Sequence, residues 1–144
     1  MAVGDRNDPY GGYNFLVEID GITRAGFREC SGLDTSQDAG EYREGTDPLT
    51  VRKLPGLIKY SNISLKRGIT DDAELWKWRK TVMDGKVVRK NMSIVLMDDA
   101  REEKLRWNLT SCWPTKWEGP SFNATSSDVA VETLEIAHEG LAKA

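Results

Sequence analysis

The segment from Lys53 to Lys80 constrains the fold more than any other, because it joins a strand pattern to a well-defined helix pattern. At about 100° per residue, the large apolar residues between Asp72 and Asp84 fall within an arc of roughly 160°. These residues are Leu75, Trp76, Trp78, Val82 and Met83. The pattern predicts a single amphipathic helix that lies against a sheet and exposes its opposite side to water.

Residues at both ends of this pattern are typical of helix boundaries. Asp71 can act as the N-cap, and Glu74 three residues later completes a capping box. Gly85 is suited to the left-handed conformation that often ends a helix. We therefore expect the helix within residues 71–84. Arg79 lies inside the apolar arc, so either its stem packs while its head reaches water, or it meets a carboxylate of another subunit.

Strand patterns lie on both sides of the helix pattern. Residues 13–20 alternate between apolar and polar types, which predicts a half-buried strand. Its apolar face carries Tyr13, Phe15, Val17 and Ile19. Asp20-Gly21 predicts a tight turn that pairs this strand with residues 22–33. Gly32 in that partner strand suggests a bulge or a close approach of two backbones.

Further strands are expected at 57–66, 86–98, 105–113 and 128–138, with a turn-rich connection at 114–127. In the first of them the apolar phase changes near Asn62, which predicts a bulge. In the third, one face is expected to carry Leu105, Trp107, Leu109 and Trp113. About six to eight strands with short connections favour an antiparallel β-sandwich or barrel with the helix packed outside.

Two neighbouring stretches do not look like parts of a core. Residues 34–45 are polar apart from Tyr42, so they predict a strand that is exposed on both sides or faces a surface formed only by assembly. Residues 46–56 are long for a hairpin loop, and loops of that length usually bind something or are disordered. This loop carries Leu49, Val51 and Leu54, and its apolar character favours binding.

Composition places the chain among soluble single-domain proteins. Its 144 residues suffice for one domain, 1–144, and the stretch 1–12 is expected to be a flexible arm. A net charge of −3 without a basic stripe argues against nucleic-acid recognition. No apolar run is long enough for a membrane span, and the polar start is unlike a signal peptide. We therefore expect no membrane insertion by this chain.

The sequence offers little for catalysis or for cofactor and metal binding. His138 is the one histidine and lies near no nucleophile motif, so we assign no catalytic residue. Cys30 and Cys112 are isolated and read as reduced structural thiols. The acidic pairs at 71–72 and 98–99 read as a helix cap and a solvated turn rather than as cation sites. We expect no cofactor and no metal.

Three segments resemble one known family. The run KLPGLIKYSNISLKRGITDDAELWKWR is similar to the tail-tube proteins of contractile phages, R-type pyocins and extracellular contractile injection systems. The opening DPYGGYNFLVEIDGITRAGFRECSGL and the ending SSDVAVETLEIAHEGL resemble the same family. The resemblance implies an antiparallel β-sandwich with a flanking helix. It also implies hexameric rings whose sheets join around a lumen and which stack into a tube inside a sheath.

The resemblance also implies roles for particular residues. The loop 47–56 would reach a neighbouring subunit, and the helix would lie on the outer side of the barrel. The expected subunit-interface residues are Asp47, Leu49, Val51, Arg52, Lys53, Leu54, Pro55, Gly56 and Arg79. The expected sheath-facing residues are Lys77 and Lys80. The implied partners are copies of the chain itself and the sheath, baseplate and terminator proteins of one particle, with possible cargo in the lumen.

The leading hypothesis is therefore a structural inner-tube subunit, assembled in the bacterial cytoplasm and carried in a phage tail or an extracellular injection particle. A second hypothesis is a monomeric β-barrel that binds a small apolar ligand in a cavity lined by Trp107, Trp113 and Trp117. A third is a secreted ring protein of the type VI secretion kind. An enzyme is the least favoured class.

Overall fold

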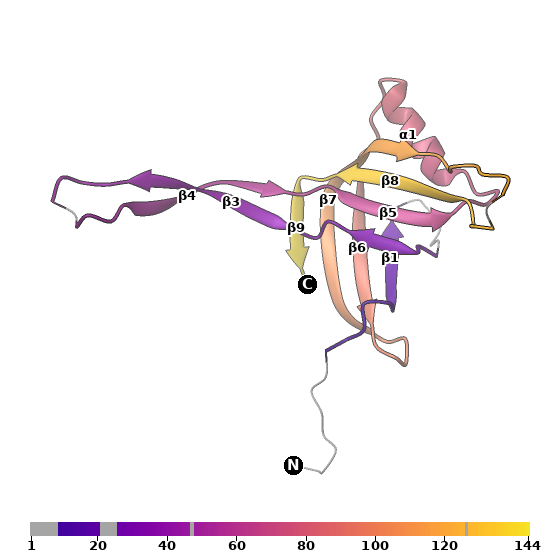
Figure 1. The fold of residues 1–144 in the computed structure, drawn as a ribbon, viewed down its shortest axis with the longest axis horizontal. Coiled ribbons are helices and arrows are strands. Elements are labelled where there is room, and N and C mark those ends of the chain that lie inside the picture. The colour runs from indigo at the N-terminus through magenta and orange to yellow at the C-terminus, as the bar shows by residue number, and fades with distance from the viewer. Residues whose placement is uncertain (1–8, 21–25, 47, 126) are drawn as a thin grey trace, which may run out of the picture.

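A computed structural model describes residues 9–20, 26–46, 48–125 and 127–144 (Figure 1). Among these residues the chain forms nine strands and one helix. Their bounds are β1 (Phe15–Ile19), β2 (Glu29–Ser31), β3 (Thr35–Tyr42), β4 (Arg52–Tyr60), β5 (Ile63–Gly68), α1 (Glu74–Met83), β6 (Lys90–Met97), β7 (Glu103–Glu118), β8 (Val131–Ala137) and β9 (Gly140–Lys143). Each strand pairing is antiparallel, which confirms the predicted mainly β fold with one helix.

The long strand β7 belongs to two layers of sheet. Its first half pairs with β6 and β9, and β6 pairs with β1; we call these strands layer one. Its second half pairs with β8, followed by β5 and β2; we call these strands layer two. Side chains of both layers meet in one hydrophobic core, which includes Val17, Ile94, Leu65 and Leu134. The two layers therefore form a sandwich joined through β7.

Two irregularities let β7 serve both layers. Ser111 has a positive φ of 54°, and at this point two residues of β7, Thr110 and Ser111, lie opposite the single residue Asn91 of β6. A second register shift follows Pro114. Each extra residue reverses the side to which later side chains point, because side chains alternate along a strand. The prediction that Trp113 shares a face with Leu109 is therefore wrong: Cys112 is buried instead.

Strand partners differ from the predicted hairpin. β1 pairs with β6, and β2 pairs with β5, so the proposed pairing of 13–20 with 22–33 is wrong; residues 21–25 lie outside the described residues. The predicted close approach at Gly32 is confirmed. This glycine has a φ of +100°, and a Cβ on it would lie 2.0 Å from the carbonyl oxygen of Asn62.

Helix α1 is shorter than the predicted range 71–84: it begins three residues later, at Glu74, and ends one residue earlier, at Met83. Ala73 occupies the N-cap position, and the carboxylate of Asp72, not Asp71, accepts the backbone N–H of Glu74 at 3.0 Å. At the other end Gly85 has a φ of +80° and donates to the carbonyl of Val82, as predicted for a glycine that ends a helix. Leu75 and Trp78 are buried, whereas Trp76 and Met83 of the predicted apolar arc are exposed.

Strands β3 and β4 form a hairpin that extends away from the sandwich (Figure 1). Within the described part of the chain they pair only with each other. Residues 52–56, predicted as part of a loop, lie in β4, and the predicted strand 57–66 is two strands separated at Ser61 and Asn62. This break, rather than a bulge, explains the change of apolar phase. We call residues 35–60 the arm.

A buried ion pair links layer two to the helix. Arg67 Nε lies 2.5 Å from Glu132 Oε1, and both side chains are almost fully buried. Arg67 also donates to the carbonyl oxygen of Asp72 at 3.1 Å, just before α1. Trp117 Nε1 donates to the second oxygen of Glu132 at 3.2 Å. The pair is therefore fully hydrogen-bonded, as a buried charge must be.

Removing one partner of this pair should destabilise the fold strongly. Glu132→Ala leaves the guanidinium of Arg67 buried without its counter-charge, so we expect a loss of about 3–5 kcal/mol in the free energy of unfolding. Urea unfolding measures this value. Glu118→Ala is the matched control, since it breaks the exposed Lys116–Glu118 pair on the same layer and should cost less than about 1 kcal/mol. Equal losses in the two variants would contradict the assignment.

Both cysteines should react slowly in the folded protein. Burial raises the pKa of Cys30 to about 11 and that of Cys112 to about 12. Since the thiolate is the reactive form, a pKa raised from 9.0 to about 11 lowers the thiolate population at pH 8 by about 100-fold. A thiol-disulfide reagent followed by absorbance should show this slowing relative to the urea-unfolded chain. Comparable rates in both states would show that the thiols are accessible.

Candidate assembly surfaces

The arm exposes apolar side chains that it cannot bury by itself. All residues of β3 and all but the last of β4 are exposed. Leu54 and Tyr42 lie on the same face of the hairpin, because Gly40 opposes Leu54 and Tyr42 opposes Arg52. Leu49 between the strands is 96% exposed. We call the exposed side chains of Tyr42, Leu49, Val51 and Leu54 the tip cluster.

Most of the predicted interface residues lie on this arm. Leu49, Val51, Arg52, Lys53, Leu54, Pro55 and Gly56 are all exposed, and Asp47 lies outside the described residues. Arg52 lies 3.9 Å from the carboxylate of Glu44, which helps to join the two sides of the hairpin. Gly56 approaches the carbonyl oxygen of Asp38 so closely that a Cβ would lie 2.8 Å from it. The structure therefore brings this predicted set together in one projecting element.

Arg79 is separate from that set. It is half-buried on α1, and its guanidinium donates to the carbonyl oxygen of Pro114 at 3.4 Å. Its guanidinium therefore has a hydrogen-bond partner within the subunit. Lys77 and Lys80 are exposed on the same helix, which lies at the edge of the sandwich in Figure 1. The candidate sheath-facing residues and the arm thus belong to different parts of the molecular surface.

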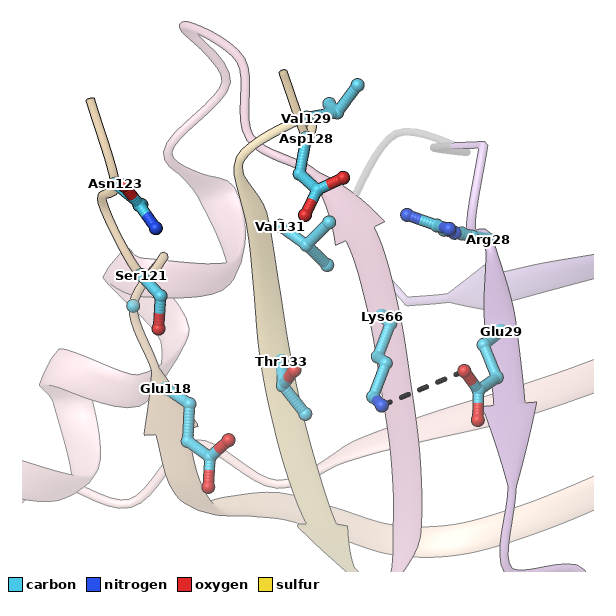
Figure 2. A pocket seen from close by; sticks show the side chains of 11 residues that line it. Arg28, Glu29, Lys66, Glu118, Ser121, Asn123, Asp128, Val129, Val131 and Thr133 are labelled. Atoms are coloured by element: carbon cyan, nitrogen blue, oxygen red, sulfur yellow. Dashed lines mark ion pairs between the residues drawn. The ribbon is translucent and has the colours of Figure 1, made fainter. Parts of the chain in front are cut away.

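The outer face of layer two is polar across its width (Figure 2). Alternate residues of β5 and β8 are buried, so the others point away from the core. One cross-strand row consists of Glu29, Lys66, Thr133 and Glu118. Lys66 Nζ lies 3.7 Å from Glu29, and Lys116 Nζ lies 2.6 Å from Glu118. We call this surface the polar face; it borders a groove of about 630 Å³.

A smaller hollow opens between β1 and β2, the strands at the two ends of the strand order. It has a volume of about 290 Å³ and is lined by apolar side chains from four strands and from Leu33, two residues after β2. These are Phe15, Cys30, Leu33, Ile94, Leu96 and Trp107. Two charged residues, Arg28 and Glu29, also line it. Sequence analysis missed both this hollow and the polar face, because the hollow combines distant segments and the polar face follows only from the pairing of four strands.

Acidic residues of the β6–β7 turn are engaged in local contacts. The backbone N–H of Glu102 donates to Asp98, and this hydrogen bond together with nearby Lys104 lowers the pKa of Asp98. Asp99 accepts the hydroxyl of Tyr13 at 2.7 Å. The Asp98 carboxylate therefore stabilises the turn itself, and the Asp99 carboxylate links the turn to the segment just before β1. His138 likewise contacts the carbonyl oxygens of Ser61 and Gly140, at 3.0 and 3.2 Å.

The three tryptophans that the second hypothesis places around one ligand cavity lie in different surroundings. Trp107 lines the apolar hollow, and Trp113 and Trp117 do not. The ring of Trp117 packs against Trp76 at a centroid distance of 4.9 Å. The geometry therefore does not gather these rings around one cavity. No described helix is long and apolar enough to cross a membrane.

Solved structures with a similar fold come from contractile injection systems. A chain from the extended-state sheath–tube complex of the PVC extracellular contractile injection system is 33% identical, with a TM-score of 0.85, and the match covers 94% of this chain and 91% of that one. A chain from the tube-terminating cap of the anti-feeding prophage is 29% identical, with a TM-score of 0.87, covering 100% and 99%.

A more distant structure shares the fold. Hcp1 from Flavobacterium johnsoniae is 18% identical, with a TM-score of 0.63, and the match covers 90% of this chain and 93% of that one. None of the curated proteins compared with the chain is significantly similar to it. The family model for the T4-like virus tail tube protein gp19 matches residues 11–142, nearly the whole chain. The chain therefore belongs to the T4-like virus tail tube protein family.

Proposed function

We propose that this chain is the structural, non-enzymatic subunit of the inner tube of a contractile phage tail or phage-tail-like injection system. In this role it forms hexameric rings that stack around a lumen. The exposed apolar side chains of the arm are the observation that best supports this proposal. A two-stranded hairpin in water is marginally stable on its own, and this one exposes apolar side chains along its length. A neighbouring subunit that covers the arm would remove those side chains from water.

The polar face supports a lumen lined by this chain. Its side chains are charged or hydroxylic and partly paired with one another, as suits a surface that stays in water. Layer two also ends in β2, whose outer edge pairs with no other strand among the described residues. Sheet edges in stable proteins are paired, covered or blocked. Pairing of such edges between subunits would join the layers of a ring into one continuous barrel with the polar face inward.

The likeness to chains of a sheath–tube complex and a tube-terminating cap supports the proposed partners. These are other copies of the chain, and the sheath, baseplate and terminator proteins of one particle, with possible cargo in the lumen. Assembly would take place in the bacterial cytoplasm before the particle leaves the cell. The exposed lysines on α1, Lys77 and Lys80, would face the sheath.

Shortening the arm should abolish tube formation and leave the subunit folded. Glu41 and Lys53 oppose each other, so residues 42–52 can be replaced by Asn-Gly, a two-residue hairpin turn. Among the removed residues, those that the structure describes are exposed and lie outside the core, so thermal unfolding should be nearly unchanged. Negative-stain electron microscopy of the whole particle preparation should show tubes for the parent chain and none for the variant. Full-length tubes from the shortened chain would refute the role of the arm.

Charge reversal on α1 should separate tube formation from sheath binding. Lys77→Glu combined with Lys80→Glu alters exposed side chains only, so tubes should form at the normal yield. Removing the attraction to an acidic sheath surface should lower sheath retention in co-sedimentation. Lys104→Glu is the control, since this exposed lysine lies near the start of β7, beside the β6–β7 turn. That turn and α1 lie at opposite ends of the sandwich (Figure 1). Equal sheath retention by both variants would exclude α1 as the sheath-facing surface.

A further inference from the structure

We propose that His138 forms a pH-dependent link between the sandwich and the root of the arm, and that the link holds the arm more firmly when the imidazole is protonated. We call residues 60–62, where β4 ends and the chain turns into β5, the root of the arm. The inference goes beyond the proposed function, because it concerns contacts within one subunit, whether or not that subunit belongs to a tube.

Both ring nitrogens of His138 lie close to a carbonyl oxygen. Nε2 lies 3.0 Å from the carbonyl oxygen of Ser61 in the root, and Nδ1 lies 3.2 Å from that of Gly140 at the start of β9. A neutral imidazole carries one N–H, so it donates to one of these oxygens and turns a nitrogen lone pair toward the other. A protonated imidazole carries two N–H groups and donates to both. Protonation therefore completes a bridge from β9 to the root.

An aromatic contact adds to this link in both protonation states. The ring centroids of His138 and Tyr60 are 5.4 Å apart, and the ring planes are inclined by 45°. This distance is within the range in which aromatic rings attract each other. The pH-dependent part of the link therefore lies in the two carbonyl contacts.

Contacts at the root set the direction of the arm. Within the described part of the chain, β3 and β4 pair only with each other, so no strand of the sandwich holds the arm. At the root, the side-chain amide of Asn62 donates to Glu135 at 3.1 Å, and the backbone N–H of Ser61 donates to the carbonyl oxygen of Asp34 at 3.3 Å. With so few contacts, one hydrogen bond gained or lost at Ser61 changes how firmly the arm is held.

His138 is the group at this root that changes charge near neutral pH. Titratable side chains also lie on the surrounding elements: Tyr60 on β4, Asp34 before β3, Glu135 on β8, Glu139 after β8 and Lys116 on β7. Among the described residues, none of these side chains is a hydrogen-bond partner of the imidazole. Carboxyl, phenol and amine side chains ordinarily titrate outside about pH 5–8, the range in which histidine does. Since the chain has one histidine, a change at the root in this range is assigned to it.

Hydrogen exchange of the full chain tests the link. The parent chain and His138→Gln are compared with each other at about pH 5.5 and again at about pH 8, so the dependence of intrinsic exchange on pH cancels. Glutamine can donate to one carbonyl but cannot gain a proton. Near pH 5.5 we expect peptides containing Asp34 or Ser61 to exchange about 2- to 10-fold more slowly in the parent chain, the effect of roughly one hydrogen bond. Near pH 8 this difference should largely disappear.

Glu139→Gln is the matched control, since it removes a charge from the same turn and keeps the imidazole. This variant should behave as the parent chain does. Magic-angle-spinning NMR of the parent chain with ¹⁵N-labelled histidine gives a second readout that needs no variant to fold. We expect two ring N–H signals near pH 5.5 and one near pH 8, with a midpoint at the pH where half of the exchange difference is lost.

Other outcomes overturn the link. Equal exchange at the root in the parent chain and His138→Gln at both pH values would show that the imidazole does not hold the arm. A difference that is the same at both pH values, or larger near pH 8, would refute the role of protonation. One ring N–H signal or none near pH 5.5 would refute the bridge to both carbonyls. Absence of tubes would count against the proposed function alone, because the link lies within one subunit.

Discussion

The fold depends on one strand that serves two sheets. β7 pairs with β6 and β9 in its first half and with β8 in its second. The left-handed backbone at Ser111 adds one residue opposite β6 and turns the strand toward the second layer. This change brings β5 and β8 over β1 and β6, so side chains from all four strands share one core. The polar face of layer two and the hollow at β1 both take their positions from this bend.

Burial is divided unevenly between the sandwich and the arm. The sandwich buries a contiguous core of apolar side chains and satisfies even the ion pair of Arg67 and Glu132. The arm encloses almost none of its own, although it has the regular pairing of a hairpin. The arm is therefore only marginally stable in the single chain, since strand pairing alone stabilises an isolated hairpin little. In the proposed tube, contact with a neighbouring subunit buries the apolar side chains of the arm and so stabilises it.

Local sequence patterns predicted the elements better than their partners. The helix followed from the spacing of Leu75 and Trp78 and from Gly85, because these signals lie within a few turns. The pairing of β1 with β6 joins Phe15 to Leu96, and no short-range pattern specifies so distant a contact. Residues 52–56 read as a loop because Pro55-Gly56 is a turn signal, yet Gly56 fits closely beside Asp38 in the hairpin. The hollow was not predictable, since it combines segments that only the folded sandwich brings together.

A contact between unlike surfaces gives the growing assembly a direction. At one extremity of a stack of rings the arms would lack a neighbouring subunit, and at the other the surface that covers an arm would stay open. The side chains left in water therefore differ between the two extremities, and Leu49 on its projecting hairpin would be exposed at only one of them. A protein that starts the polymer and a protein that stops it must then offer complementary shapes that are not interchangeable. The geometry of a single subunit would in this way set which extremity elongates and which is closed.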